Sequence, residues 1–266
     1  MKDILDDLEN KLNIKITNIE NHKEGTSSSL VFGVNKKYLI KTMNVSELNN
    51  QQIFLNVYKN INYFQKIILV NKNLNYICFK YINGIKLKEY RFKLNMIDEI
   101  YKIVKSYKKY DCDFYGYFDY RYSSAYLFLK SEIEYASEKI KDIDTKIVYE
   151  SLNKLKKYKI EKYLLHGDFG LHNMLLVNNK IKVIDAMPLV FSPIYDFYFA
   201  CLSSTICFNN LNLLFNYFDY DMEYKKNLFI IVFYIRMSRA YVYDKNKFES
   251  YLEIYNKLEG ILKDGN

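Results

Sequence analysis

The chain has 266 residues, half of them hydrophobic, which is enough to bury the core of one domain or of two closely joined lobes. Its net charge of +8 comes from lysines spread along the chain, without the basic and aromatic stripe of a nucleic-acid footprint, so we expect no nucleic-acid partner. There is no membrane-span pattern, no signal peptide and no C-x-x-C spacing among the four cysteines, so we expect a cytoplasmic protein with free thiols, no membrane association and no zinc site.

The first part of the chain has the pattern of a small antiparallel sheet. β-rich segments at 14–20 and 30–34 flank residues 23–29, where a glycine and small hydroxyl residues would let backbone N–H groups approach phosphate oxygens. The next strand, 38–41, ends at Lys41, which is placed to contact phosphates too. Each feature alone is weak evidence for phosphate binding. A turn of this composition is also typical of an ordinary flexible loop, and a lone lysine on a strand is normally solvated.

One helix and two further strands complete this part. Residues 45–55 predict a helix with Ser46 as a candidate cap. The strands 66–70 and 76–82 are joined by a polar turn and end at the turn signal Asn83-Gly84. We therefore predict that residues 1–82 form one lobe of five antiparallel strands with one helix.

Residues 83–266 predict mainly helices. Apolar residues recur at three- and four-residue spacings, with charge on the opposite face, in the segments 96–107, 131–140, 145–158 and 226–241. We assign none of their Tyr, Phe or Met residues a role in cofactor binding. The predicted fold class is α+β, with a small sheet-containing amino-terminal lobe and a larger, mainly helical carboxy-terminal lobe.

The most informative motif lies in this second part, His166-Gly-Asp-Phe-Gly-Leu-His-Asn173, followed later by Val183-Ile-Asp185. ATP-dependent phosphoryl transfer uses a loop of the form H-x-D-x-x-x-x-N, in which the aspartate is a base and the asparagine and a later aspartate hold a metal. Two short apolar strands and an Asn-rich turn lie between Asn173 and Asp185, and such a hairpin would return both residues to one end, where Mg²⁺ could bridge them. The alternative is that His166-Gly-Asp168 is only a polar turn between a helix and a strand.

The triplet Asp168-Phe-Gly spells the DFG of protein kinases, whose aspartate binds metal. It follows His166-Gly167 and precedes Asn173, so it occupies the catalytic-loop position instead. We therefore predict Asp168 as the catalytic residue and Asn173 and Asp185 as the metal ligands.

At these residues the chain resembles the aminoglycoside phosphotransferase family of small-molecule kinases, relatives of choline kinase with a protein-kinase-like, two-lobed fold. The family's H-G-D-x-x-x-x-N loop, its I-D motif and a following P-x-x-x-x-x-x-Y-D segment match His166–Asn173, Ile184-Asp185 and Pro188 to Asp196. The resemblance implies that His166 and Asp196 support the loop. It departs at Phe191-Ser192-Pro193, where the family usually has Gly-Asp-Pro.

The resemblance also implies a nucleotide site between the lobes, for ATP or GTP with Mg²⁺. Residues 24–27 look like the family's E-G-x-S loop, which makes Ser27 a phosphate contact beside Lys41, and the backbone around Lys80, Tyr81 and Ile82 would meet the adenine. Kinases pair that lysine with a helix glutamate. The family pattern places the glutamate where a glutamine stands here, so the open candidates for this partner are Glu47, Gln51 and Gln52.

The function implied is transfer of the γ-phosphate to a hydroxyl of a small molecule, foremost an aminoglycoside or amino sugar, by a monomer or weak dimer. A choline or metabolite kinase with the same site and a catalytically silent nucleotide-binding relative are the alternatives. Two acidic groups amid tyrosines either bind ammonium groups of an acceptor or are ordinary polar loops. These groups are Asp111, Asp113 and Asp119, and Asp219, Asp221 and Glu223.

Overall fold

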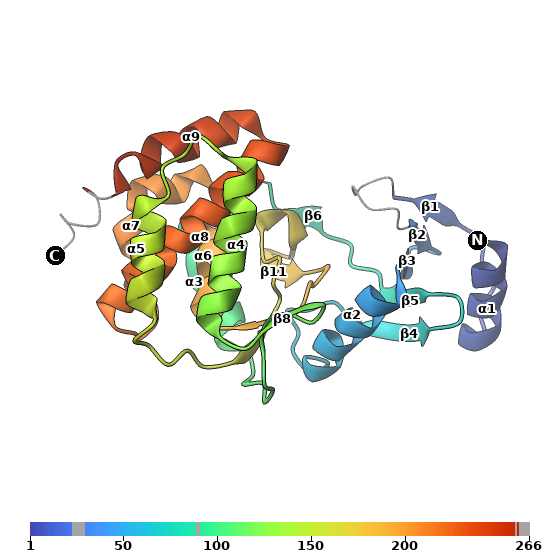
Figure 1. The fold of residues 1–266 in the computed structure, drawn as a ribbon. Coiled ribbons are helices and arrows are strands. Elements are labelled where there is room, and N and C mark those ends of the chain that lie inside the picture. The colour runs from blue at the N-terminus through green and yellow to red at the C-terminus, as the bar shows by residue number, and fades with distance from the viewer. Residues whose placement is uncertain (23–29, 89–90, 259, 261–266) are drawn as a thin grey trace. The chain divides into compact units, whose positions relative to one another are not determined.

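The computed structural model describes residues 1–22, 30–88, 91–258 and 260. The chain forms two compact units, one of Met1–Ile85 with Leu175–Met187 and the other of Lys86–Met174 with Pro188–Asn266. The first unit thus includes residues 175–187, which lie far beyond the predicted lobe boundary at residue 82. The predicted nucleotide turn with Ser27 lies outside the described residues. Figure 1 shows antiparallel sheets in one unit and mainly helices in the other, which confirms the predicted α+β class.

The first unit contains a five-stranded antiparallel sheet in the order β1-β2-β3-β5-β4. The predicted first strand is shorter than expected, because the backbone N–H groups of Thr17 and Asn18 donate to Asn35 Oδ1 (2.8 and 3.1 Å) and not to a neighbouring strand. The strands are β1 (Ile19–Asn21), β2 (Val31–Val34), β3 (Tyr38–Thr42), β4 (Ile67–Asn71) and β5 (Tyr76–Lys80).

Two helices accompany this sheet, α1 (Lys2–Leu12) and α2 (Val45–Val57), where one was predicted. The unpredicted α1 forms because Ile4 and Leu8, four residues apart on one face, are buried against the sheet residues Phe32, Val34 and Ile40. The predicted helix is α2, but its cap is not Ser46. Asn44 precedes the helix in extended backbone, and its side chain accepts the Glu47 N–H at 2.8 Å.

The predicted hairpin is confirmed as β10 (Met174–Val177) and β11 (Lys180–Val183), which form a three-stranded sheet with β6 (Ile85–Lys86). Its turn residues Asn178 and Asn179 have φ of 50° and 60°, a left-handed conformation that asparagine tolerates better than most residues. The end of β11 is fixed by the backbone of Val183, which donates to Tyr63 O at 2.8 Å and accepts from Gln65 N at 3.1 Å. These bonds set the position of the next residues, including Asp185.

The second unit is mainly helical around α8, which packs against α4, α5, α6 and α9 (Figure 1). Of these, α6 and α9 were not among the predicted segments. All nine residues of α6 are buried, so it has no polar face to produce a periodic pattern. Pro193 is its first residue, where a proline costs no hydrogen bond. The helices are α3 (Met96–Lys105), α4 (Ala125–Lys139), α5 (Lys146–Leu155), α6 (Pro193–Cys201), α7 (Leu211–Leu214), α8 (Met222–Tyr243) and α9 (Lys245–Tyr255).

A four-stranded antiparallel sheet of order β8-β7-β12-β9 lies in the same unit. Its strands are β7 (Tyr115–Tyr117), β8 (Tyr120–Tyr122), β9 (Tyr163–Leu165) and β12 (Leu189–Phe191). The strand β9 leads directly into the predicted catalytic motif, and β12 leads into α6. Pairing of β9 with β12 therefore brings the start of the motif close to the start of α6.

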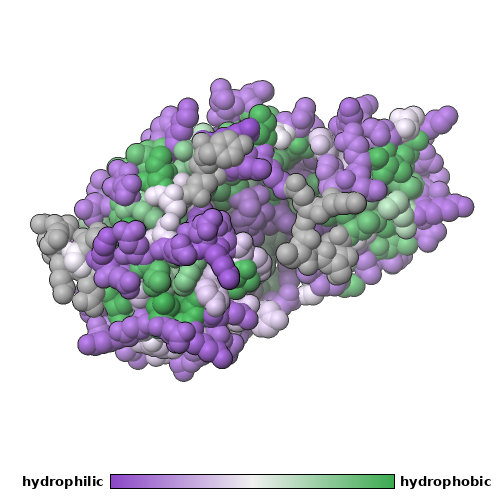
Figure 2. Space-filling model, turned by 90° about the horizontal axis from the view of Figure 1, so that it is seen from above, coloured by the Kyte–Doolittle hydropathy of each residue, from purple (hydrophilic) through white to green (hydrophobic). Residues whose placement is uncertain are grey.

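Among the described residues, no helix has both the length and the apolar character needed to cross a bilayer. Figure 2 shows hydrophilic side chains over much of the face it displays, with hydrophobic residues in scattered groups.

Candidate active site

The predicted catalytic motif is a tight loop in the second unit, running from His166 at the end of β9 to a single 3-10 turn at Leu171–Asn173. Gly167 has φ of 80°, in the left-handed region that favours glycine. Gly170 is needed for space, because a Cβ there would lie 2.6 Å from the His172 ring. The two glycines thus allow the loop to turn back so that His172 and Asn173 face Asp168.

The Asp168 carboxylate accepts hydrogen bonds on both oxygens. Oδ1 accepts from Nη1 of Arg239 at 3.2 Å, and Oδ2 is bonded to Nδ2 of Asn173 at 2.9 Å and Nε2 of His172 at 3.0 Å. The Asn173 amide also donates to the backbone carbonyl of Asp168 at 2.9 Å. About a quarter of the Asp168 side chain, 26%, remains exposed, so the group is held in place yet can be reached.

These contacts set the charge of Asp168. Burial by itself would raise the pKa of the carboxyl group, but the hydrogen bond and charge of His172 and the charge of Arg239 outweigh it and hold the pKa well below its ordinary value. Asp168 is therefore a carboxylate at neutral pH. It can accept a hydrogen bond from an approaching hydroxyl group.

Asp196, in the first turn of α6, is fully buried and accepts three hydrogen bonds on Oδ2. The donors are the backbone N–H of His166 (2.9 Å), the backbone N–H of Gly167 (3.2 Å) and the Tyr107 hydroxyl (2.8 Å). Burial raises the pKa of Asp196 to about 7, against the lowering effect of these hydrogen bonds. The side chain ties α6 to the loop two residues before Asp168.

A second cluster lies in the first unit around Asp185. Lys41 at the end of β3 forms an ion pair with Oδ1 of Asp185, and Nε2 of Gln51 donates to the same oxygen at 3.2 Å. Asp185 has φ of 60°, a left-handed conformation uncommon for residues other than glycine, and its side chain is 47% exposed. Gln51 is buried, so its amide is fixed in this contact.

Of the three candidate partners of Lys41, Gln51 is the one whose side chain reaches the Lys41–Asp185 pair within the described part of the chain. The glutamine does not supply a countercharge, and Lys41 takes its countercharge from Asp185. The backbone of Glu47 instead completes the cap of α2.

The predicted base-binding segment lies at the end of β5. The N–H of Lys80 donates to Lys66 O at 2.9 Å, and that of Tyr81 donates to Lys37 O at 2.8 Å. Both groups are therefore engaged within the first unit. Contacts of a base with this segment have to come from its carbonyl groups or from Ile82.

In the acidic group Asp219, Asp221 and Glu223, two side chains make contacts that stabilise the second unit. Asp221 caps α8 by accepting the Tyr224 N–H at 3.0 Å and accepts the Tyr158 hydroxyl at 2.6 Å. Glu223 forms an ion pair with Lys157. For these two acids the polar-loop interpretation is favoured over acceptor binding.

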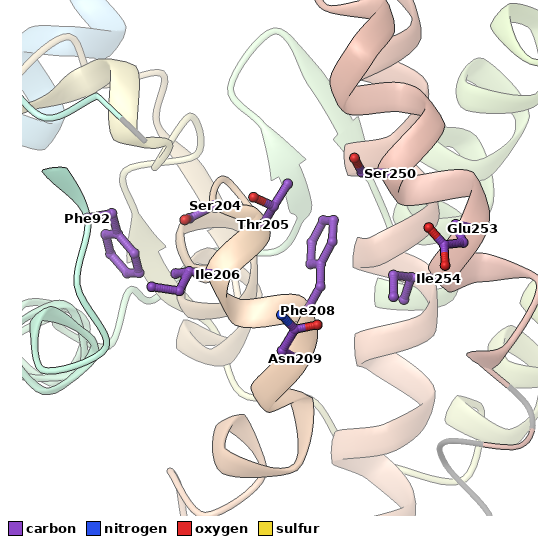
Figure 3. Close-up of a pocket in the computed structure, with 9 residues that line it drawn as sticks. All are labelled: Phe92, Ser204, Thr205, Ile206, Phe208, Asn209, Ser250, Glu253 and Ile254. Atoms are coloured by element: carbon purple, nitrogen blue, oxygen red, sulfur yellow. The ribbon is translucent and has the colours of Figure 1, made fainter. Parts of the chain in front are cut away.

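A pocket of about 530 Å³ lies in the second unit between α9, the segment Thr205–Asn210 and Phe92 (Figure 3). Its charged lining residue among those described, Glu253, is ion-paired with Lys257 at 2.7 Å. The pocket therefore offers no unpaired charge to a ligand, and we assign it no part in the site.

Two residues that contact Asp168 were not predicted as site residues, His172, at an unspecified position of the motif, and Arg239. The more distant of them is Arg239. It belongs to no motif and lies 71 residues from Asp168 along the chain. The only sequence signal is a charged residue among the apolar positions of α8, near Ile235, Met237 and Ala240, which are buried. A long-range ion pair of this kind cannot be read from local periodicity.

No family model matches the chain, and no curated protein matches it by sequence. Solved structures do match it. Choline kinase LicA from Streptococcus pneumoniae is 14% identical with a TM-score of 0.62, over 99% of this chain and 98% of that one. Aminoglycoside phosphotransferase APH(2'')-Ib with ADP bound is 16% identical with a TM-score of 0.57, over 96% and 98%. The gentamicin complex of APH(2'')-IIa is 17% identical with a TM-score of 0.59, over 97% and 96%.

These likenesses extend over nearly the whole length of both proteins, at identities that establish the fold alone. They confirm the fold that the resemblance implied: the chain has the protein-kinase-like fold shared by choline kinase and the aminoglycoside phosphotransferases.

Proposed function

We propose that the chain transfers the γ-phosphate of a nucleoside triphosphate to a hydroxyl group of a small molecule. The observation that carries the proposal is the Asp168 carboxylate, kept charged and oriented by Arg239, His172 and Asn173 in a chain with a phosphotransferase fold. The acceptor that we propose is an aminoglycoside or amino sugar. The support is that a structural neighbour was solved with gentamicin, while the likeness to choline kinase keeps choline as the second candidate.

In the proposed reaction, the acceptor hydroxyl donates a hydrogen bond to Asp168, which orients the hydroxyl oxygen toward the γ-phosphorus. A bond forms between these two atoms, the bond from the γ-phosphorus to the bridging oxygen breaks, and the nucleoside diphosphate leaves with the electron pair. The hydroxyl proton passes to Asp168. Because the pKa of this carboxyl is held low, the proton then passes to water. Positioning supplies much of the rate enhancement in such a reaction.

The donor set suits Mg²⁺, which prefers carboxylate and amide oxygens together with phosphate oxygens and water. The amide nitrogen of Asn173 is used on Asp168, which leaves its Oδ1 for a cation, and the Asp185 carboxylate is about half exposed. We propose Asn173 and Asp185 as the protein ligands. The bound ion would neutralise charge on the phosphates. Lys41, and Ser27 in the part of the chain outside the described residues, are the proposed phosphate contacts, and the backbone of residues 80–82 is the proposed base contact.

The test is release of ADP and GDP from ATP and GTP, with Mg²⁺ or with excess EDTA, in the presence of aminoglycosides, choline or simple metabolites. We expect release that an aminoglycoside stimulates and that EDTA abolishes. Stimulation by choline alone would keep the chemistry and change the acceptor. Nucleotide binding without transfer to any acceptor would contradict the proposal in favour of a silent binding protein.

Gln51→Leu should raise the Mg²⁺ concentration for half-maximal activity by about 10- to 100-fold, the usual cost of removing a partner that orients a metal ligand. Leucine keeps the volume and the helix propensity of glutamine but cannot donate to Asp185. Gln52→Leu, at the neighbouring position on α2, is the matched control and should leave the Mg²⁺ dependence unchanged. A larger shift in Gln52→Leu would mean that the wrong glutamine has been assigned.

A further inference from the structure

We propose that Arg239 is a positioning residue for Asp168, one that presents Oδ1 of the carboxylate to the acceptor hydroxyl. The proposal rests on the phosphotransferase function above. A carboxylate oxygen has room for about two hydrogen bonds. Among the described residues, Oδ2 of Asp168 has two partners, Asn173 and His172, whereas Oδ1 has one, Nη1 of Arg239 at 3.2 Å. The acceptor hydroxyl would therefore bind at Oδ1, beside the guanidinium group.

Arg239 is itself held rigidly. It lies in the last turns of α8, with 28% of its side chain exposed, and its guanidinium carbon is 4.6 Å from the centre of the Phe199 ring. Phe199 is fully buried in α6, the helix that also carries Asp196. The position of the guanidinium over the ring, together with its hydrogen bond to Asp168, restricts the directions in which its N–H groups donate. One helix thus supports both the backbone before Asp168 and the cation on its side chain.

The guanidinium keeps its charge in this setting. Burial lowers the pKa of Arg239, but nearby Tyr117 and Asp168 oppose that effect, and the pKa stays above its ordinary value. Glu132 on α4 is a further acid that interacts with Arg239. Burial raises the pKa of the Glu132 carboxyl, and the charge of Arg239 opposes part of that rise. A permanent cation at Oδ1 restrains the carboxylate more strongly than a neutral donor would.

The chain offers a matched control one helical turn away. The guanidinium carbon of Arg236 lies 4.4 Å from the centre of the same Phe199 ring. In the described part of the chain, the arginine that contacts Asp168 is Arg239 and not Arg236. Replacing Arg236 therefore removes a cation from the same aromatic contact without removing the donor to Asp168.

The first experiment compares kcat and nucleotide KM for Arg239→Gln, Arg239→Lys and Arg236→Gln. We expect Arg239→Gln to lower kcat by about 10- to 100-fold, as expected for loss of a charged hydrogen bond, with little change in nucleotide KM. Arg239→Lys should restore part of the loss, because it keeps the charge and loses the planar fork. Arg236→Gln should retain the wild-type kcat. A normal kcat in Arg239→Gln, or an equal loss in Arg236→Gln, would overturn the proposal.

The second experiment does not depend on turnover. Urea unfolding midpoints are measured for Arg239→Gln, Asp168→Asn and the double variant, with Arg239→Lys replacing the glutamine variant if that one does not fold. We expect the double variant to lose less than the sum of the two single shifts, because the contact can be lost only once. Additive shifts would overturn the pairing itself. Coupled shifts in a protein without any transferase activity would refute the proposed function and reduce the pair to a structural one.

Discussion

Replacing Asp185 by asparagine should lower turnover by about a thousandfold while the protein stays folded, because a neutral amide in place of the proposed carboxylate ligand holds the metal less tightly and removes several kcal/mol of charge stabilisation from the transferring phosphoryl group. Asparagine is the right substitution for this position. Asp185 has φ of 60°, which asparagine tolerates and alanine does not, so Asp185→Ala would add backbone strain to the chemical effect. The same change deprives Lys41 of its ion-pair partner.

The measurement is kcat at saturating nucleotide and Mg²⁺, beside the thermal unfolding midpoint. Asp6→Asn, an exposed carboxylate on α1 in the same unit, is the control and should keep both values. Turnover within about tenfold of wild type in folded Asp185→Asn would contradict the assignment of Asp185 as a metal ligand.

Much of the fold could be predicted because its segments have local patterns. The apolar strands β3 and β5 and the hairpin β10–β11 are marked by short apolar runs and Asn-rich turns. The helix α6 has no such pattern, since every residue in it is buried. The late start of β1 follows from the Thr17 and Asn18 N–H groups, which donate to Asn35 Oδ1, and periodicity does not show these bonds. The cap of α2 was misplaced by two residues because Asn44 and Ser46 are both good capping types.

In the candidate site, too, some residues could be predicted from local spacing and others only from tertiary packing. Asp168 and Asn173 could be predicted because their spacing within one loop brings them into contact, with the Asn173 amide 2.9 Å from Asp168 Oδ2. Choosing Gln51 among three candidates required the position of α2 beside Asp185, 134 residues further along the chain. The contact of Arg239 with Asp168 depends on the packing of α8 against α6, and the one local signal, a charge among buried positions of α8, does not reveal its partner.

Asp168, in the loop His166–Asn173, and Asp196, which binds the backbone of that loop, are in opposite electrostatic settings. Asp168 is partly exposed and faces the His172 ring and the Arg239 guanidinium group, which hold its pKa below the ordinary value. Asp196 is fully buried and meets only neutral donors, and burial raises its pKa to about 7. The first setting suits the role proposed for Asp168, that of an anion next to the acceptor. The second suits a group whose work is to hold two backbone N–H groups in place.

Asp168→Asn should abolish turnover, with a loss of about a thousandfold or more, and leave nucleotide binding intact, because the variant lacks the anion that orients the hydroxyl and takes its proton. Its amide nitrogen would also have to face one of the donors that now point at the carboxylate, either Arg239 on one side or Asn173 and His172 on the other. Steady-state kcat and equilibrium titration with a nucleotide separate these effects. Near-normal kcat would contradict the mechanism, and lost nucleotide binding would mean that the whole loop has been disturbed.

Stability against pH supplies an independent check on the charge of Asp168. Its folded-state pKa lies below the ordinary value of 3.8, so the folded protein binds fewer protons there than the unfolded chain. The ionised group therefore contributes stability that is fully present above that value and is lost as the pH falls below it. Asp168→Asn removes this contribution. The difference in free energy of unfolding between wild type and variant should be constant at neutral pH and shrink below about pH 4. A difference that does not change down to the acid limit of the folded state would show that Asp168 is not held as a paired carboxylate.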